Sequence, residues 1–454
     1  MGPTGAGLAC GSVPSNGGSP NDRTVSARAQ AVLKCADAVP VRVLLYLLRC
    51  FGRAAVHRGG VRWGRVVPFL FVSMGIAILA LLPGAFADTT GTATVLAVAR
   101  TAEDFGTGKL YAWGDNASGQ LGLGDRTGRL RRTQVGTFTD WQRVAAGPDH
   151  ACALRSDTLW CTGRNDNGQL GTGDTEQRTT LTQVGTSKTW SAADVGQTHT
   201  CATRLSGTLY CWGSNNSGEL GLGDTASRNT PVQVGTASDW VAVTAGIEYT
   251  CGIRADRSLW CWGRNTSFQL GLGDTANRMA PAQVGAATWA DVAASHTHTC
   301  GTRVDQTLWC WGENTYGQLG TGDNVNRTHP APVGPGVSWA SVAAGRLHTC
   351  ATREEGTLWC WGRNSDGRLG LGDTSDRTSP VQVGKAKYWA TVTAGRVHSC
   401  GVRAGKIISC WGGNASGQLG QGDTATRRQP TTIPGAKARP LRTGSNSSSN
   451  LSIG

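Results

Sequence analysis

Short runs in which apolar and polar residues alternate follow one another through most of the chain. In one stretch these runs cover residues 380–383 (PVQV), 389–395 (WATVTAG), 398–403 (HSCGVR) and 408–412 (ISCWG). Alternation with a period of two is typical of half-buried β-strands. The Asn-x-x-Gly and Gly-x-Gly-Asp motifs between the runs are typical of tight turns. The pattern predicts four short antiparallel strands in each such stretch.

The same pattern returns every 49 or 50 residues, and a glycine, which follows tryptophan in six of the seven copies, marks each return. A unit of four strands cannot bury both of its faces alone, whereas radial repetition packs each unit against the next. Seven copies therefore predict an all-β fold, a seven-bladed β-propeller of four-stranded antiparallel blades. The marking glycines are Gly114, Gly163, Gly213, Gly263, Gly312, Gly362 and Gly412.

The two ends of the repeat region predict how the ring closes. The last copy ends with TTIPG at 431–435, and residues 95–114 align without a gap on residues 144–163. We therefore expect inner strands from the N-terminal side to complete a blade whose outer strand comes from the C-terminal side, which removes the open edge. The predicted propeller covers 92–435, and the Ser- and Asn-rich tail, 436–454, is expected to be disordered.

The segment 61–87 has the parts of a secretory signal peptide. Arg62 and Arg65 precede an apolar run, and a small-x-small motif ends at Ala87, which predicts cleavage between Ala87 and Asp88.

The apolar run of this segment is also close to the length that spans a bilayer, so an uncleaved signal anchor is the alternative. Residues 1–60 show no assignable pattern, and we interpret them as a disordered segment or the product of a start codon placed too far upstream. Either form of the signal predicts that the remainder leaves the cytoplasm and is secreted or held at the cell surface.

Composition and charge agree with a β-rich binding protein. The chain has 65 glycines and 17 tryptophans, which suits many short strands and turns better than a helical enzyme. Of the net charge of +13, residues 1–87 hold nine Lys and Arg against two Asp and Glu, and the rest holds 34 against 28. The remaining excess is mild, so charge gives no indication of nucleic acid binding.

The twelve cysteines after residue 87 form six pairs, and each pair flanks one predicted hairpin. A three-residue turn that ends in Gly207 would place Cys201 opposite Cys211, at a separation that a disulfide can close. Cys152 and Cys161 are one residue closer, and a two-residue turn keeps them opposed. The predicted disulfides are Cys152–Cys161, Cys201–Cys211, Cys251–Cys261, Cys300–Cys310, Cys350–Cys360 and Cys400–Cys410.

The first copy supports the bonds, because it lacks both cysteines together and has Glu103 and Ala112 in their places. Six disulfides also fit export to an oxidising compartment.

Zinc is an alternative to the disulfides, since His199 and a pair of cysteines could offer three ligands. The fourth copy has Tyr249 in place of that histidine and keeps both cysteines, which counts against zinc. Reduced thiols in a cytosolic protein are the third interpretation. We predict no metal and no cofactor.

An Asp in Gly-x-Gly-Asp and an Arg four residues later recur in all seven copies. Seven identical ion pairs predict a structural role, as braces between blades or caps of turns, rather than seven catalytic sites. The pairs are Asp125 and Arg129, Asp174 and Arg178, Asp224 and Arg228, Asp274 and Arg278, Asp323 and Arg327, Asp373 and Arg377, and Asp423 and Arg427.

Histidines and tryptophans recur in the same way. A histidine in each of five copies is expected to bond a neighbouring turn, because residues one blade apart cannot share a metal ion; these are His150, His199, His298, His348 and His398. Two sets of tryptophans are expected to pack between blades. The set that begins strands after a variable loop is the better candidate for partly exposed rings; it is Trp141, Trp190, Trp240, Trp289, Trp339 and Trp389.

The motifs WGxNxxGQLGxGD and VAAGxxHT resemble the regulator of chromosome condensation (RCC1) repeat, over about residues 92–435. The resemblance implies a seven-bladed propeller. The founding member of that family is a nucleotide exchange factor for a small GTPase, other members are segments of ubiquitin ligases, and some secreted bacterial propellers of this type inhibit β-lactamases. The resemblance therefore implies the fold and leaves several functions open.

Binding is the function that the sequence favours, because no catalytic constellation is confined to one copy. His296 and the pair of Glu354 and Glu355 are the candidates for an enzyme site, and a Glu pair in a hairpin turn is typical of a solvated surface. We predict an exported, monomeric, non-catalytic scaffold that binds a protein or a cell-surface polymer through loops on one face. A guanine-nucleotide exchange factor-like regulator is the alternative, and a β-lactamase-inhibitor-like propeller is the third hypothesis.

The informative positions are those at which the copies differ. They are the pair of residues before the histidine, the loop between Val-Gly and the second tryptophan, as at 236–239, 335–338 and 385–388, and the stretch after Gly-Asp, as at 126–132.

Overall fold

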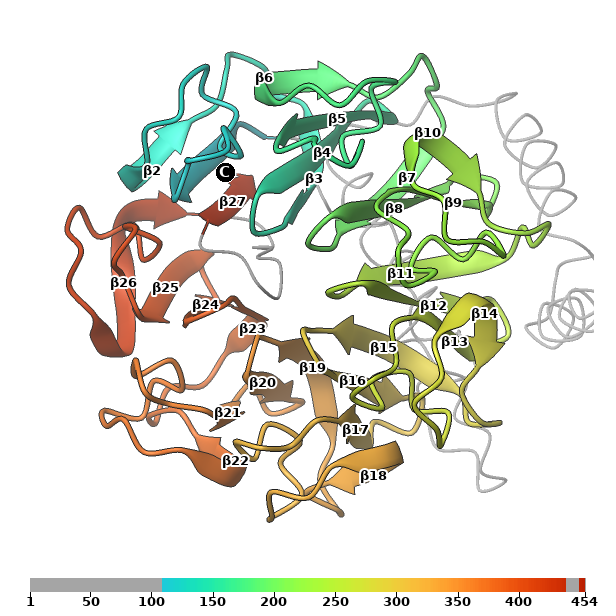
Figure 1. The fold of residues 1–454 in the computed structure, drawn as a ribbon. Coiled ribbons are helices and arrows are strands. Elements are labelled where there is room, and N and C mark those ends of the chain that lie inside the picture. Colours follow the sequence, from blue (N-terminus) through green and yellow to red (C-terminus); the bar gives the residue numbers. More distant parts are fainter. Residues whose placement is uncertain (1–107, 438–448, 454) are drawn as a thin grey trace, which may run out of the picture. The chain divides into compact units, whose positions relative to one another are not determined.

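The computed structural model describes residues 108–437 and 449–453, and every regular element in them is a β-strand. The strands form six four-stranded sheets and one three-stranded sheet, with antiparallel pairing throughout. Figure 1 shows these sheets arranged as blades around a central opening. The predicted all-β, seven-bladed propeller is thus confirmed.

The blades are numbered in chain order. The first contains β1 (Leu110–Gly114), β2 (Arg129–Gln134) and β27 (Ser449–Ile453). The second contains β3 (Trp141–Ala146), β4 (His150–Arg155), β5 (Thr158–Gly163) and β6 (Arg178–Gln183). The third contains β7 (Trp190–Val195), β8 (His199–Arg204), β9 (Leu209–Gly213) and β10 (Arg228–Gln233). The fourth contains β11 (Trp240–Ala245), β12 (Tyr249–Arg254), β13 (Leu259–Gly263) and β14 (Arg278–Gln283).

The remaining blades follow the same order of four strands. The fifth contains β15 (Trp289–Ala294), β16 (His298–Arg303), β17 (Leu308–Gly312) and β18 (Arg327–Val333). The sixth contains β19 (Trp339–Ala344), β20 (His348–Arg353), β21 (Leu358–Gly362) and β22 (Arg377–Gln382). The seventh contains β23 (Trp389–Ala394), β24 (His398–Arg403), β25 (Ile407–Gly412) and β26 (Arg427–Lys437).

The ring closes with strands from both ends in the first blade, but not with the strands that the sequence predicted. The expected outer strand at 431–435 lies in β26 and pairs with β25 inside the seventh blade. The C-terminal contribution is β27, which pairs with β1 along the edge opposite β2. The expected N-terminal inner strands lie outside the described residues.

Strand β27 corrects the expectation of a disordered tail at 436–454 for residues 449–453, whereas 438–448 and 454 lie outside the described residues. The segment 449–453 has a short alternating pattern, and its register places Leu451 opposite Ala112. Strand β1 would otherwise leave a row of backbone N–H and C=O groups open, so pairing with a short tail strand satisfies them. The predicted signal segment 61–87, its cleavage site at Ala87 and Asp88, and residues 1–60 lie outside the described residues.

The hydrophobic core lies between neighbouring blades rather than within one sheet. Between the second and third blades, for example, Leu170 and Val184 pack with Trp190 and Trp212. Both sets of tryptophans are buried, which corrects the expectation that the set at the strand starts would be partly exposed; Trp389, the most exposed of that set, has 4% of its surface accessible. In five blades the centroids of the two indole rings lie 5.5–5.9 Å apart. The rings are inclined to each other, so that the edge of one packs toward the face of the other, as aromatic pairs prefer.

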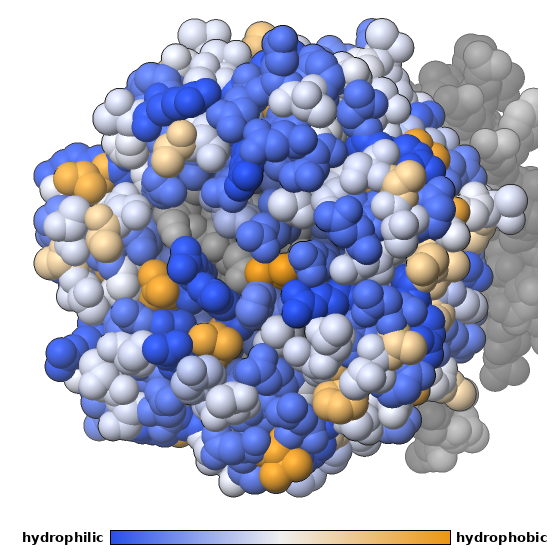
Figure 2. Space-filling model, viewed as in Figure 1, coloured by the Kyte–Doolittle hydropathy of each residue, from blue (hydrophilic) through white to orange (hydrophobic). Residues whose placement is uncertain are grey.

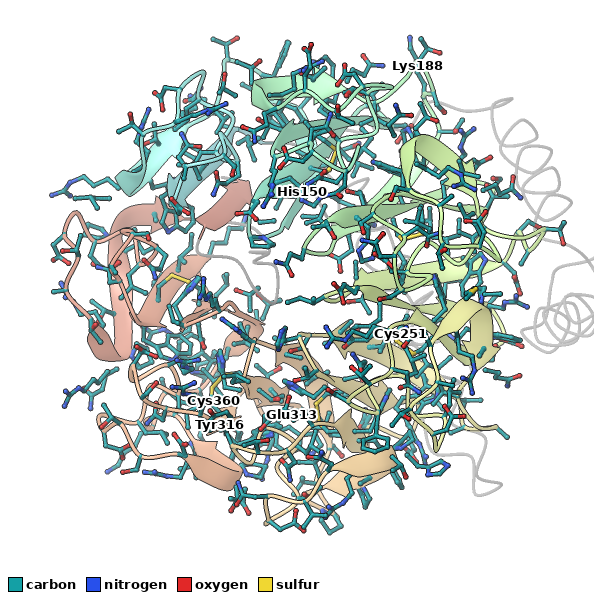
Figure 3. All side chains as sticks on the ribbon, in the orientation of Figure 1. His150, Lys188, Cys251, Glu313, Tyr316 and Cys360 are labelled. Carbon is teal, nitrogen blue, oxygen red and sulfur yellow. A yellow bond between two sulfur atoms is a disulfide. The ribbon has the colours of Figure 1, made fainter. Side chains whose placement is uncertain are left out.

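All six predicted disulfides are present, each between the second and third strands of a blade. The strands place Cys201 directly opposite Cys211, and Cys152 directly opposite Cys161, as the turn lengths predicted. Figure 3 labels Cys251 and Cys360 and draws the sulfur bonds inside the blades. The twelve sulfur-bearing residues are fully buried.

Among residues 108–437 and 449–453, no helix is long and apolar enough to cross a membrane.

Candidate binding face

The recurring histidines join each blade to the next. Nε2 of His150 lies 2.9 Å from Oγ1 of Thr200 in the following blade, and that hydroxyl donates to the carbonyl oxygen of Gln169 at 2.8 Å. The same hydrogen bond between neighbouring blades recurs at His199, His298 and His348. The histidine partner is thus a strand residue of the next blade rather than the expected neighbouring turn.

Tyr249 performs this role in the fourth blade, where the histidine is missing. Its hydroxyl donates to the carbonyl oxygen of His298 at 2.8 Å and lies 2.9 Å from Oγ1 of Thr299 in the fifth blade. The longer phenol side chain therefore reaches the same threonine position as the imidazole. A position that keeps its contact while changing its residue type has a structural role, which accounts for the histidines without a metal.

The recurring Asp and Arg pairs lie within single loops. Nη2 of Arg129 is 2.6 Å from Oδ2 of Asp125, and the six equivalent pairs span 2.6–2.7 Å. Oδ1 of Asp125 accepts the backbone N–H of Thr127 at 2.9 Å and the side-chain amide of Asn116 at 3.1 Å. The hydrogen bond from Arg129 lowers the pKa of Asp125. These contacts fit turn caps, and none of the seven pairs joins two blades.

One face of the propeller combines two series of turns. The backbone N–H of Arg164, directly after β5, donates to the carbonyl oxygen of Asp149, directly before β4, at 2.8 Å. Equivalent bonds of 2.8–2.9 Å recur in the third to seventh blades. We call this surface the histidine face; it comprises the turns 147–149, 196–198, 246–248, 295–297, 345–347 and 395–397 together with Asp115, Arg164, Ser214, Arg264, Glu313, Arg363 and Gly413.

Glycine permits the close approach of the two turns. Gly163 has a φ of +107°, and a Cβ atom there would lie 2.3 Å from the carbonyl oxygen of Asp149. Any larger residue would therefore push the turns apart. The repeated glycine thus gives every blade the same backbone at this face, and only the side chains beside it differ.

The first and second blades make the histidine face acidic on one side. Arg164 lies between Asp149, at 3.6 Å, and Asp166, at 2.7 Å. Burial raises the pKa of Asp149, and the nearby carboxylates of Asp115 and Asp166 add to this effect, while Arg164 opposes it. Two carboxylates thus share the guanidinium of Arg164, and a third, that of Asp115, lies near enough to Asp149 to raise its pKa.

The third and fourth blades are neutral or balanced at the same positions, and the fifth carries the carboxylate of Glu313. The third has Gln197 and Ser214, and the fourth has an ion pair of 3.0 Å between Arg264 and Glu248. The fifth has His296, whose pKa is lowered by burial and by the positive charges of neighbouring arginines.

The sixth and seventh blades make the face basic. Arg346 and Arg396 occupy the turns before the two histidines, and Arg363 follows β21. Burial, followed by the positive charges of Arg396 and Arg363, lowers the pKa of Arg346. In the view of Figure 2, hydrophilic residues surround the central opening, with isolated apolar residues between them.

The opposite face carries the hairpin turns between the cysteine strands and the loops that precede the strand-start tryptophans; we call it the hairpin face. The backbone N–H of Trp240 donates to the carbonyl oxygen of Gly207 at 2.9 Å, which joins these two series. The variable loops 236–239, 335–338 and 385–388 therefore lie on a different face from the pairs before the histidines. A shallow depression of about 450 Å³ lies there beside Trp240 and Arg254.

Sequence reasoning missed the arginines that end the second strand of the second to seventh blades. Arg303 lies over the ring of Trp309 at 3.6 Å, and Arg353 lies over Trp359 at 3.7 Å. Arg204 and Arg254 stack similarly. Their signal was present, because the Cys-x-x-Arg spacing recurs in every copy that has cysteines. We attribute to them a structural role, since cation–π stacking repeats around the ring.

Two departures from the repeat were also missed, both at the buried position that is glutamine in the other five copies: Glu219 and Arg368. Oε1 of Glu219 accepts from the hydroxyl of Ser214 at 2.9 Å, and Oε2 accepts from the backbone N–H of Ser217 at 2.8 Å. Burial raises the pKa of Glu219. No described Lys, Arg or His lies within ion-pair distance of it.

Replacing Glu219 by glutamine should stabilise the protein at neutral pH by about 1 kcal/mol, because a buried carboxylate without a cation loses hydration that its two hydrogen bonds replace only in part. The folded-state pKa is raised, so this carboxyl binds its proton more tightly when folded. The gain should therefore shrink as the pH falls toward the ordinary glutamate pKa. Urea unfolding of both proteins at pH 7.5 and 5 measures the difference.

The exposed Glu354 provides the matched control, since E354Q removes the same charge without touching a buried site. It should change stability by no more than about 0.5 kcal/mol. A loss of stability in E219Q at both pH values would contradict the expectation.

Among residues 108–437 and 449–453, no group of three or more His, Cys, Asp and Glu side chains could hold a metal ion. His296 and the pair of Glu354 and Glu355 lie on different faces of the propeller, so the structure does not bring the enzyme candidates together.

Known proteins share this architecture. A structure of Prp20p from Saccharomyces cerevisiae, reported with its binding to Gsp1p and histones, has a TM-score of 0.70 at 22% identity, covering 77% of this chain and 92% of that one. Yeast RCC1 (Prp20) bound to Kap60 has a TM-score of 0.71 at 20% identity, covering 81% and 95%. Human WBSCR16 has a TM-score of 0.69 at 17% identity, covering 76% and 98%. No curated protein matches the sequence.

A family model matches the sequence directly. The model of the regulator of chromosome condensation (RCC1) repeat matches six segments that together cover more than half of the chain: 107–154, 156–203, 206–253, 256–301, 305–352 and 355–402. A second model of the same repeat matches five segments between 141 and 368. The chain therefore belongs to the RCC1 repeat family.

Proposed function

We propose that this protein is an exported, non-catalytic scaffold that binds another protein through its histidine face. The observation that carries the proposal is the uneven distribution of charge over that face. The second to seventh blades share one backbone at this face, yet the side chains on the face change from acidic in the first and second blades to basic in the sixth and seventh. Complementary charge patterns of this kind orient protein partners and select among them.

Two further observations support export. Six buried disulfides fit an oxidising compartment, and residues 61–87 have the pattern of a secretory signal. The alternative is an exchange-factor-like regulator, which the likeness to Prp20p, reported with its binding to Gsp1p, brings into consideration. That alternative requires a cytosolic protein, in which such bonds are rarely kept.

A photo-crosslinking residue at Gln197 should capture the partner, whereas the same residue at Lys188 should not. Both positions belong to the third blade, but Gln197 lies in a turn of the histidine face and Lys188 in a loop of the hairpin face. Figure 3 shows Lys188 at the periphery of the propeller. Gln197 lies in the neutral part of the histidine face, so the replacement leaves both charged sectors unchanged. The experiment uses the disulfide-bonded protein in its native host, and mass spectrometry identifies the adducts.

Equal capture from both positions would argue against the histidine face. Capture of a cytosolic GTPase from Gln197 would favour the exchange-factor alternative. Capture of an extracytoplasmic protein from Gln197 alone is the expected result.

A further inference from the structure

We propose that the guanidinium groups of Arg346, Arg363 and Arg396 form a binding site for an acidic segment of the partner protein. This inference rests on the proposed function and adds the chemistry by which one sector of the histidine face would hold the partner. It assigns that role to the sixth and seventh blades.

Hydrogen-bonded turns hold the three arginines together. The backbone N–H of Arg346 donates to the carbonyl oxygen of the residue before Arg396 at 3.1 Å. The backbone N–H of Arg363 donates to the carbonyl oxygen of the residue after Arg346 at 2.9 Å. Nη1 of the buried Arg368 donates to the carbonyl oxygen of Arg396 at 2.9 Å. Three side chains from two blades therefore start from a connected, preorganised backbone, which lowers the entropic cost of binding.

The three guanidinium groups lack a carboxylate of their own. Among the described residues, no Asp or Glu oxygen lies within 4.0 Å of Arg346, Arg363 or Arg396, although most equivalent charges elsewhere on this face are paired, as in the bond between Arg264 and Glu248. On the sixth blade the carboxylate of Asp366, three residues after Arg363, is bonded to Arg368.

The seventh blade carries no charged side chain directly after β25, because Gly413 stands where the other copies carry a side chain and Val397 packs against it. Burial lowers the pKa of Arg346, and the like charges of Arg396 and Arg363 lower it further, so an anion bound beside the cluster would relieve repulsion. Arg396 is exposed, while Arg346 and Arg363 are half-buried, which leaves their charged groups within reach of a ligand.

Protein carboxylates fit this cluster better than a nucleic acid. The planar guanidinium binds carboxylates through two parallel hydrogen bonds. A polyanion that extended past the sixth and seventh blades would meet Asp115 and Asp149 on one side and Glu313 on the other. A nucleic acid would also need exposed aromatic rings for its bases, and the nearby ring of Tyr316 is covered by Arg363 at 4.8 Å. A short acidic segment ends before it reaches the carboxylates.

Fluorescence anisotropy with a labelled peptide of alternating Glu and Gly tests the site on the disulfide-bonded protein. The double variant R346Q/R396Q should bind this peptide on the order of 100-fold more weakly, about tenfold for each arginine. The variant K385Q/K387Q removes the same charge from exposed lysines of the hairpin face and should bind as the unchanged protein does. Thermal unfolding of both variants checks that they remain folded.

Three outcomes would overturn the inference: no peptide binding at millimolar concentration, equal weakening in both variants, or tighter binding of a single-stranded oligonucleotide of equal charge. Each of them leaves the crosslink from Gln197 untouched, so failure of this site is distinguishable from failure of the proposed function. If R346Q/R396Q loses the peptide but still crosslinks its partner through Gln197, the arginines strengthen binding by this face and do not define it.

Discussion

Reduction of the six disulfides should unfold the propeller. Each bond closes a hairpin with a sequence separation of nine or ten residues, and in the chain-entropy model a loop of this size stabilises the folded state by about 2–3 kcal/mol. Six such bonds together reach or exceed the whole stability of an ordinary domain, about 5–15 kcal/mol. The reduced protein, refolded by dilution from urea with reductant present, should therefore lose its cooperative unfolding transition.

The intact mass of the native protein, measured before and after reduction in denaturant, checks that the six disulfides are formed. The mass should rise by two hydrogens for each of the six bonds, and a chain that begins at Asp88 would also establish cleavage of the signal. Because all twelve cysteines are fully buried, reduction under native conditions should be slow.

The first blade provides the design of a control, since Ala112 stands there at the position of the second cysteine. The double variant C201A/C211A places alanine at both cysteine positions of the third blade and should lose about 2–3 kcal/mol, the contribution of one bond. A reduced protein within about 1 kcal/mol of the oxidised one would show that interblade packing, rather than the bonds, determines the stability.

The sequence was sufficient for the features that repeat. One hairpin with opposed cysteines is a weak signal, but in all six copies the turn length allows a register in which the two cysteines lie opposite each other. That register is observed, down to the shorter turn that keeps Cys152 opposite Cys161. The number of blades follows for the same reason, because each copy must bury its faces against the next.

The sequence predicted that strands from both ends share a blade, but it did not predict which C-terminal strand takes part. The alignment of 95–114 on 144–163 placed Glu103 opposite Ala112, whereas the structure pairs Ala112 with Leu451. Backbone hydrogen bonds at an open edge accept any extended segment within reach, so pairing there depends on three-dimensional proximity. The sequence of the tail shows only a short alternation, which is too little to distinguish a strand from a linker.

The binding face could not be chosen from sequence for a related reason. The variable pairs before the histidines and the variable loops before the tryptophans lie at opposite ends of the same strands. Only the observed register, which brings Arg164 beside Asp149, shows which variable positions share a surface. The charge sectors of that surface then become visible, although each charge was already present in the sequence.

Acidification from pH 7 to pH 5.5 should destabilise the propeller by about 5 kcal/mol through four buried histidines. Burial lowers the pKa of His150 to about 3, of His199 to about 4 and of His298 to about 3, and it lowers that of His348 well below the ordinary value. All four are fully buried. An unfolded chain would protonate them near pH 6.5.

The hydrogen bonds explain why the proton is excluded. The hydroxyl of Thr200 donates to a carbonyl oxygen, so it can only accept from His150, and Nε2 of that ring must carry the hydrogen. Nδ1 is then the atom that would take the second proton, and at His150, His199 and His348 it is buried without a partner among the described residues. Protonation would thus place a charge at a buried atom that has no acceptor to receive it.

The sign follows from these pKa values. Because the folded-state pKa is depressed, the stability that the neutral rings provide is fully present above about pH 6.5 and is lost as the pH falls toward the folded values. Below about pH 6 each ring should cost about 1.4 kcal/mol per pH unit. Urea unfolding at several pH values between 5 and 8 gives this slope, which counts the protons taken up on unfolding.

The fourth blade shows how one titrating histidine can be replaced while the hydrogen bond between neighbouring blades is kept. The hydroxyl of Tyr249 is hydrogen-bonded to the next blade, so the variant H199Y should keep the contact to Thr250. The slope of unfolding free energy against pH should then correspond to about one proton fewer taken up on unfolding. The reverse variant, Y249H, should add about one proton. If both variants kept the original slope, the acid sensitivity would come from groups other than the histidines that join neighbouring blades.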